Sequence, residues 1–181
     1  MSKEIKICHG RPEDVPGRPM EEIKTYDVLD ALGISYARAD HDPELTMEDC
    51  QRADEALGAS ACKNLFLRNS QKTRFYLLMM PGEKKFKTKD LSHQLGIARL
   101  SFAEEEFMVR YLGVHPGSAT VMGLIHDPEH KVSLVIDREV AEEPFIVCHP
   151  CANTSSIKVK TEDVLEKLLP YTGHTPAFVE L

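Results

Sequence analysis

The chain has 181 residues, of which 42% are apolar and 28% are charged, and its net charge is −7 at pH 7. This length and composition predict one globular domain with a sizeable core, preceded by a short extension. The negative charge excludes a protein that coats nucleic acid non-specifically, because such binding must neutralise many phosphates, whereas a few local lysines can still hold one RNA end. No apolar run approaches the roughly 20 residues of a membrane span, and the first residues lack the apolar core of a signal peptide. We therefore expect a cytoplasmic protein with five reduced cysteines.

Residues 1–18 contain several glycines and prolines and show little periodicity. We interpret them as an N-terminal extension of a single domain over 19–181. Pro19 opens the first helix of that domain and Gly33 ends it. The expected elements of the first part of the domain, in chain order, are a helix over 19–32, a strand over 34–38, a helix over 46–58, strands over 62–68 and 73–80, and helices over 88–95 and 103–112.

Four further strands are expected after a glycine-bearing loop, and Thr161 is the expected N-cap of a last amphipathic helix. These elements are strands over 119–125, 131–137, 144–148 and 155–160, and a helix over 161–169. Helices and hairpins alternate irregularly, which predicts an α/β (α+β) fold with a mixed, largely antiparallel sheet rather than a doubly wound parallel one.

The segment 112–124 joins a tight turn directly to an apolar run. Pro116 restricts its own φ, and Gly117 can adopt positive φ without steric cost. Such a turn can direct several backbone N–H groups at one point, as an anion or oxyanion site requires. Most Pro-Gly turns only reverse the chain, so this segment gains weight from two other polar clusters at strand ends.

The first of these clusters is Lys63 and Asn64, at the start of an apolar strand. A lysine at this position must keep its ammonium group at the strand end or pair it, and an isolated case would be a lysine that reaches out to solvent. Asn64 alternates to the opposite face of a regular strand, so spacing alone does not combine the two residues into one site.

The second cluster is the polar run from His149 to Ser156, which follows an apolar strand. It is either a plain loop stabilised by local hydrogen bonds or the rim of a ligand site. A separate run of four lysines (Lys84, Lys85, Lys87 and Lys89) is either a solvated face or a short phosphate grip.

Two other chemistries are weighed against these clusters. A serine nucleophile is disfavoured, because Ser118 does not lie in a Gly-x-Ser-x-Gly elbow. Cys148 and Cys151 form a Cys-x-x-Cys pair, but a redox motif of that kind is usually followed by a helix, and here a strand is expected. A structural zinc site could combine the two cysteines with His126 and His130, and it is kept as a minor alternative.

Four segments together resemble the YbaK/prolyl-tRNA synthetase-associated editing domain family, and in particular its members that deacylate alanyl-tRNA(Pro). The resemblance extends over nearly all of residues 20–181. The segments that carry it are Lys63–Arg68, Leu91–Ala103, Leu112–Ser118, and His149-Pro150 with Asn153, and Thr172-Gly173-His174 is also similar.

The resemblance implies an α/β fold around a partly barrel-like sheet surrounded by helices, and hydrolysis of a mischarged aminoacyl-tRNA without a metal cofactor. It implies the tRNA 3′ end as partner, suggests prolyl-tRNA synthetase as a second partner, and predicts neither a membrane nor a DNA partner. The catalytic candidates are Lys63, Gly117, Ser118 and His149. The substrate-binding candidates are Asn64, Gly113, His115, Pro116, Asn153, Lys84, Lys85 and Lys87.

Two departures from the family pattern affect specificity. Members often carry a proline where this chain has Val121, and the Cys148/Cys151 pair is not typical of the family. Two alternative functions therefore stay open. One is a non-catalytic module of the same fold that senses an amino acid or a charged tRNA, and the other is a zinc- or thiol-dependent protein.

Overall fold

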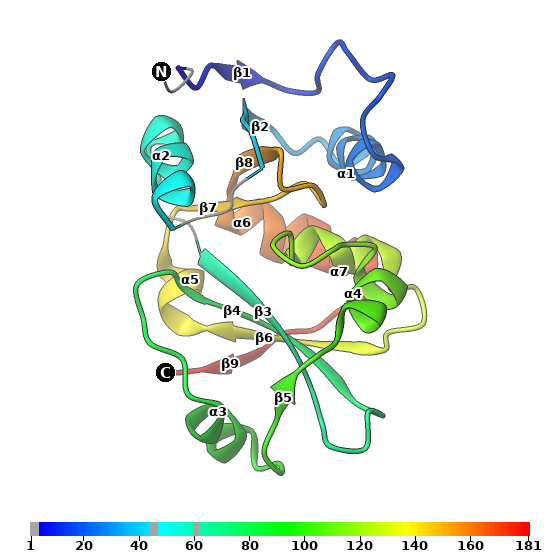
Figure 1. Cartoon of the computed structure of the whole chain (residues 1–181), viewed down its shortest axis with the longest axis vertical. Helices are drawn as coiled ribbons and strands as arrows, with labels where there is room; N and C mark the ends of the chain where they lie inside the picture. Colours follow the sequence, from blue (N-terminus) through cyan, green and yellow to red (C-terminus); the bar gives the residue numbers. More distant parts are fainter. Residues whose placement is uncertain (1–3, 44–46, 60–61) are drawn as a thin grey trace.

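The structure is a computed structural model, and it describes residues 4–43, 47–59 and 62–181. Two open sheets lie one above the other, with the N-terminal part of the chain at one end (Figure 1). The first sheet is antiparallel throughout, with the spatial order β1 (Ile7–His9), β2 (Tyr36–Asp40), β8 (Ser155–Lys160) and β7 (Phe145–Cys148). The second sheet has the order β5 (Ser101–Phe102), β3 (Cys62–Arg68), β4 (Phe75–Pro81), β6 (Val132–Asp137) and β9 (Ala177–Val179).

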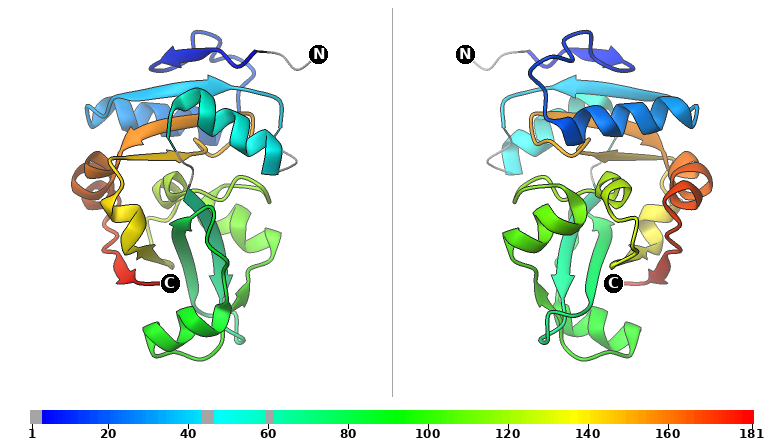
Figure 2. Two further views of the ribbon diagram at one scale, coloured as in Figure 1. Left: turned by 90° about the vertical axis from the view of Figure 1, so that its left-hand side faces the viewer. Right: turned by 90° about the vertical axis from the view of Figure 1, so that its right-hand side faces the viewer.

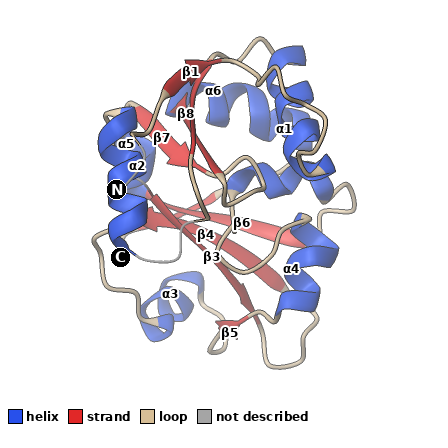
Figure 3. Ribbon diagram, turned by 45° about the horizontal axis from the view of Figure 1, so that its top comes forward, coloured by secondary structure: helices blue, strands red, loops and turns tan. Residues whose placement is uncertain are grey.

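Helices surround both sheets, as Figure 3 shows. In chain order they are α1 (Met20–Ala31), α2 (Met47–Leu57), α3 (Thr88–Leu95), α4 (Glu105–Leu112), the 3₁₀-helix η1 (Val121–His126) and α5 (Arg138–Glu142), followed by α6 (Thr161–Asp163), the π-helix η2 (Val164–Leu168) and α7 (Leu169–Thr172), which continue one another. None of the described helices is both long and apolar enough to cross a membrane.

The predicted α/β class and the mixed, largely antiparallel pairing are confirmed. β3 and β4 form the predicted hairpin in regular antiparallel register, whereas the pairs β4–β6 and β6–β9 are parallel. The predicted helices over 19–32 and 88–95 are confirmed, and the helix over 46–58 is confirmed from Met47, since Thr46 lies outside the described residues.

The hydrophobic core explains why the strands read as continuous apolar runs. Phe66 and Leu77 face the larger cluster, which also contains Tyr26 of α1 and Ile157 of the first sheet. Their neighbours in β3 and β4 face a smaller cluster against α3, formed by Leu67, Leu78, Leu91 and Leu100, among others. Because the second sheet is covered on both faces, its central strands lack the polar–apolar alternation of a half-exposed sheet.

Three expectations are wrong. The strands do not close into a barrel-like sheet but divide between two open sheets. The run expected as a strand over 119–125 is the helix η1, and Thr120 caps it by accepting a hydrogen bond from the Met122 backbone N–H. This run is buried and apolar, so its periodicity could not separate a strand from a buried helix. Thr161 is not an N-cap: Lys160 occupies that position, and the buried Oγ1 of Thr161 has no partner among the described residues.

The N-terminal segment packs on the domain rather than extending from it, in the part of it that the structure describes. Its strand β1 pairs with β2, and Figure 2 shows the segment lying along the first sheet. Arg11 forms ion pairs with Asp27 at 2.9 Å and Asp30 at 3.3 Å, both on α1. The division between extension and domain at residue 18 stays a prediction.

Gly123 supplies a test of the packing between η1 and α4. A Cβ atom at this position would lie 2.9 Å from both the Cβ and the backbone oxygen of Leu112, closer than carbon atoms normally approach. We expect Gly123→Ala to lower the free energy of unfolding by about 1–3 kcal/mol, because η1 must shift away from α4. Urea denaturation measures this loss, and an unchanged midpoint would show that the helices separate at no cost.

Candidate active site

A cavity of about 860 Å³ lies where the two sheets meet, at the start of β3 and the end of β7. Its walls come from six segments of the chain. The lining side chains that carry polar or reactive groups are Cys62, Lys63 and Asn64 of β3, Cys148 and His149, Ser156 of β8, Glu83 after β4, and Cys50, Gln51, Asp54 and Glu55 of α2, and Gly117 and Ala119 of the loop before η1 contribute backbone groups.

Lys63 and Asn64 lie on opposite faces of β3. The register is regular, with Lys63 opposite Met80 and Asn64 opposite Met79, so no bulge brings the two side chains together. The Nζ atom of Lys63 donates to the backbone oxygen of Lys84. The Nδ2 atom of Asn64 donates to the backbone oxygen of Cys62 at 3.4 Å, while its buried Oδ1 atom has no partner in the described part of the chain. Oδ1 is therefore an acceptor next to the cavity that the protein does not use.

The turn at Gly117 places backbone rather than side-chain groups at the cavity. Gly117 has φ +90°, which favours glycine. Ser118 is buried, and both its backbone N–H (3.1 Å) and its hydroxyl group (2.9 Å) donate to the backbone oxygen of His115. The backbone N–H groups of Gly117 and Ala119 have no hydrogen-bond partner among the residues described. These two donors are the anion-binding candidates of the turn.

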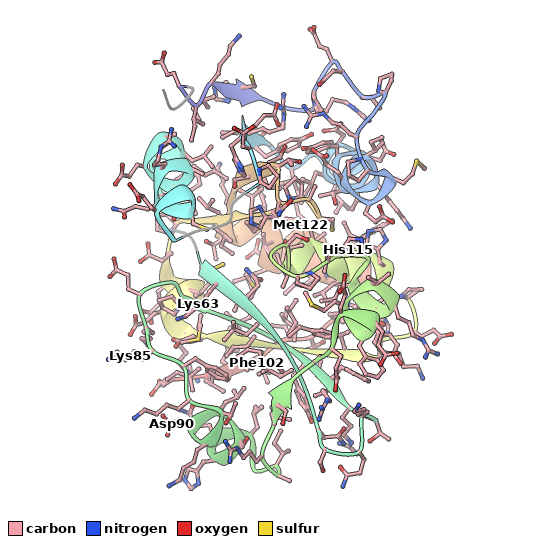
Figure 4. All side chains as sticks on the ribbon, viewed as in Figure 1. Lys63, Lys85, Asp90, Phe102, His115 and Met122 are labelled. Atoms are coloured by element: carbon pink, nitrogen blue, oxygen red, sulfur yellow. The ribbon has the colours of Figure 1, made fainter. Side chains whose placement is uncertain are left out.

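The other candidates of this loop lie outside the cavity lining. Gly113 ends α4 with φ +64° and packs against the ring of His126. His115 is exposed and pairs with Glu105 at 3.1 Å, and Figure 4 shows it near α4, away from Lys63. Pro116 is exposed as well. Asn153 lies beside Gly117, where an added Cβ atom would be 3.9 Å from its Nδ2 atom.

His149 is oriented by two backbone contacts. Its Nδ1 atom lies 2.8 Å from the backbone oxygen of Ser155, and its own backbone oxygen accepts from the hydroxyl group of Thr120 at 2.7 Å. Because a carbonyl oxygen only accepts, Nδ1 carries the proton of the neutral ring and Nε2 is its basic nitrogen. The ring also packs edge-on to His41, with centroids 6.3 Å apart.

A buried polar cluster holds the loop that carries His149. Glu22 of α1 is 1% exposed and accepts hydrogen bonds from Arg18 at 2.8 Å, Tyr26 at 2.7 Å and Ser155 at 3.2 Å. The Ser155 hydroxyl group also lies 2.6 Å from Asp40. This cluster connects the N-terminal segment, α1, β2 and β8, and it ends on the residue whose carbonyl oxygen orients His149.

The lysine run does not act as one group. Lys84 forms ion pairs with the buried Asp137 at 3.1 Å and with Glu139 at 2.8 Å. Lys85 is exposed at the outer edge of the loop before α3, as Figure 4 shows. Lys87 lines a second cavity, of about 880 Å³, between α3, β3 and β5, and Lys63 lines both cavities.

The cysteines have the properties of buried thiols. Burial raises the pKa of Cys62 and Cys151 to about 12 and also raises the pKa of Cys148, so all three are protonated at neutral pH. A protonated thiol is a poor nucleophile and a poor metal ligand. His130 donates to or accepts from none of them and instead contacts the backbone oxygen of Thr172 at 2.9 Å. Within the described residues, no group of three or more His, Cys, Asp or Glu side chains is arranged to hold a metal ion.

The sequence analysis missed several residues that line the cavity, and it also missed His41, which contacts two of the lining residues. The α2 side chains of Gln51, Asp54 and Glu55 looked like the ordinary polar face of a helix, and no spacing relates them to Lys63 or His149. His41 follows β2 directly, and its Nε2 atom lies 2.9 Å from the hydroxyl group of Ser156. A polar residue at a strand end was the available signal for His41, the same signal that identified Lys63.

The cluster around Glu22 predicts an acid-sensitive fold. Burial alone would raise the pKa of Asp40, but hydrogen bonds from Arg18, Arg38 and Ser155 lower it well below the usual value of 3.8. A carboxyl group whose pKa is lowered by folding stabilises the protein above its unfolded pKa and loses that effect as the pH falls. We expect Arg18→Ala to cost about 1–3 kcal/mol at pH 7, and less at pH 3, where Asp40 has already begun to lose its contribution.

Urea denaturation at pH 7, 4 and 3 measures this difference. Arg11→Ala is the matched control, because its ion pairs are exposed and should contribute less than about 1 kcal/mol at each pH. If both variants lost the same stability at all three pH values, the cluster around Glu22 would not be the cause of acid sensitivity.

Comparison with known proteins assigns the chain to a family. The family model of the aminoacyl-tRNA editing domain matches residues 41–167. The prolyl-tRNA editing protein ProX of Acetoanaerobium sticklandii is 31% identical over 153 residues, which cover 84% of this chain and 93% of the relative. Prolyl-tRNA synthetase associated domain-containing protein 1 of Danio rerio is 30% identical over 155 residues, covering 84% and 83%.

A solved structure shares the fold. It is described as a candidate trans-editing enzyme for prolyl-tRNA synthetase, and it matches with a TM-score of 0.66 over 91% of this chain and 99% of that chain, at 14% sequence identity. The family expected from the four sequence segments is confirmed: this chain belongs to the aminoacyl-tRNA editing domain family.

Proposed function

We propose that this protein is a trans-editing hydrolase that deacylates mischarged tRNA in the cytoplasm, with Ala-tRNA(Pro) as its substrate. Family membership and the names of the relatives, which refer to prolyl-tRNA editing, support this function. The observation that carries it is one cavity lined by Lys63, Asn64, Gly117 and His149, which come from three distant segments. Prolyl-tRNA synthetase would be the source of the mischarged substrate.

The reaction is hydrolysis of the ester between the amino acid and the terminal ribose. Water adds to the ester carbon, the bond to the ribose oxygen breaks, and that oxygen takes up a proton. The N–H groups of Gly117 and Ala119 would stabilise the negative oxygen that develops in the transition state, and one such donor contributes about 3–4 kcal/mol in other hydrolases. The Nε2 atom of His149 would hold the attacking water, and the ammonium group of Lys63 would bind the ester carbonyl or the terminal phosphate.

The cavity also offers groups for the substrate's α-ammonium group. The unpartnered Oδ1 atom of Asn64 is one acceptor, and the carboxylates of Asp54, Glu55 and Glu83 line the same cavity. A positive ligand group is favoured among such acceptors, because a buried acceptor without a partner costs about 1–3 kcal/mol. This arrangement supports a free amino acid ester as the ligand in preference to an N-blocked one.

A separate hydrolytic site removes the alanine that a proline-binding site cannot reject. Losing about one methylene group from a ligand weakens binding by only about 1–3 kcal/mol, so a prolyl site admits alanine. A separate hydrolytic site restores fidelity. Val121, which stands where members of the family often carry a proline, is fully buried at the first position of η1 and does not line the cavity.

Lys63→Ala tests the site. We expect the rate of Ala-tRNA(Pro) deacylation to fall about 10²–10³-fold, because the variant lacks the only cation that lines this cavity among the described residues. The measurement is release of labelled alanine, with the melting temperature as a check of folding. Lys131→Ala is the control, since Lys131 is exposed on a turn remote from the cavity. Full activity of Lys63→Ala would remove Lys63 from the mechanism.

The substrate is tested with tRNA(Pro) charged with alanine, serine, cysteine or proline. We expect the alanyl ester to be hydrolysed fastest and the prolyl ester slowest, because an editing site must admit the smaller side chain and exclude the larger one. The readout is the deacylation rate of each ester by the wild-type protein. Tight binding of all four without turnover would instead support a non-catalytic sensing module.

A further inference from the structure

The cavity between α3, β3 and β5 is chemically different from the candidate active site. Lys63, Lys87, Lys89, Arg99 and His93 supply its charged or titratable groups, and none of its described lining residues is acidic. Lys87, Lys89 and Arg99 form no ion pair with any described residue. In a chain with a net charge of −7, cations collected without partners around one cavity indicate an anionic ligand.

An aromatic side chain stands at the same cavity. Phe102 of β5 is 57% exposed, although it is a large apolar residue, and the ring of Phe86 contacts it edge-on with centroids 6.1 Å apart. Phe86 supports Phe102 from one side and leaves the rest of the ring exposed. Exposed aromatic rings next to basic side chains are the combination that binds single-stranded nucleic acid, because bases stack on the rings while cations neutralise the phosphates.

Lys63 connects this cavity with the candidate active site. It lies at the start of β3 (Figure 4), and it lines both cavities. The esterified end of a charged tRNA is single-stranded, so a strand lying in the basic cavity would pass Lys63 and deliver its last ribose to Asn64, Gly117 and His149. The two cavities then divide the substrate by charge, with phosphates among the basic residues and the amino acid among the acidic ones.

We propose that the cavity lined by Lys87, Lys89, Arg99 and Phe102 binds the single-stranded 3′ end of the tRNA, with one base stacked on Phe102. The inference rests on the proposed function for the direction of the strand, but binding itself requires no hydrolysis. Lys84 has no part in it, because its ammonium group is paired with Asp137 and Glu139.

Binding of an uncharged RNA hairpin that mimics the acceptor stem tests the proposal. The hairpin carries a fluorophore at its 5′ end and either a single-stranded 3′ overhang or a blunt end, and anisotropy gives the dissociation constant. We expect the overhang to strengthen binding to the wild-type protein. Phe102→Ala should weaken binding of the overhang hairpin about 5- to 150-fold and leave the blunt hairpin unaffected. Tyr171→Ala, which removes an equally exposed ring at 57%, should change neither.

The charge contribution is measured by salt dependence. Lys89→Ala combined with Arg99→Ala should reduce the slope of log K against log salt concentration by about 1.4, at about 0.7 for each lost phosphate contact. Lys131→Ala should leave the slope unchanged. In deacylation assays the same double variant should raise KM and leave kcat unaltered, because it touches the strand and not the ester.

The outcomes separate this proposal from the proposed function. Equal binding of overhang and blunt hairpins, or normal binding by Phe102→Ala, overturns the RNA site even if the protein hydrolyses Ala-tRNA(Pro). Overhang-dependent binding without hydrolysis of any charged tRNA supports the RNA site and overturns the editing activity. A dimer that dissociates in Phe102→Ala while RNA binding is unchanged would assign the exposed ring to a second copy of the chain and overturn the proposal.

Discussion

A carboxylate buried at 1% exposure, that of Glu22, is the group around which the first sheet is organised. Removing a carboxylate from water is costly unless hydrogen bonds replace the lost hydration. Here Arg18, Tyr26 and Ser155, each from a different segment, donate hydrogen bonds to its Oε1 atom, whereas its buried Oε2 atom has no partner among the described residues. The hydrogen bonds to one oxygen of this carboxylate therefore link the N-terminal segment, α1 and β8. It also fixes Ser155, whose carbonyl oxygen orients the ring of His149.

The regular pleat of β3 determines how its two polar residues are placed at the site. Because side chains alternate along an unbulged strand, Lys63 and Asn64 leave the backbone in opposite directions. One faces the side of the sheet covered by α3, and the other faces the core shared with the first sheet. The start of β3 therefore borders two cavities, one on each face of the second sheet. A substrate with a polyanionic part and a cationic part matches that division, because the two cavities carry opposite charges.

Packing also decides the chemistry of the cysteines. The Cys-x-x-Cys spacing is compatible with redox or zinc chemistry, but both thiols are buried and their pKa values are raised by burial. Cys62 and Cys148 line the cavity, but burial raises the pKa of both thiols and so disfavours a thiolate. The hydrolytic interpretation therefore depends on backbone N–H groups, a lysine and a histidine, and needs no protein nucleophile.

The sequence by itself determined the elements whose signals are local, such as the β3–β4 hairpin, α1 after Pro19 and α3 before Gly96. It also selected Lys63, Gly117 and His149 as candidates, because polar residues and turns at the ends of apolar runs can be recognised in the sequence, and these three residues line one cavity. Only the tertiary structure decided that Val121–His126 is a helix and that Lys84 forms ion pairs with acidic side chains. It also decided that α2 and Phe102 border the cavities and that His41 packs against His149. The reason is physical: a buried apolar run has no solvent-facing side to reveal its period, and the partner of a charge is set by contacts between segments far apart in the chain.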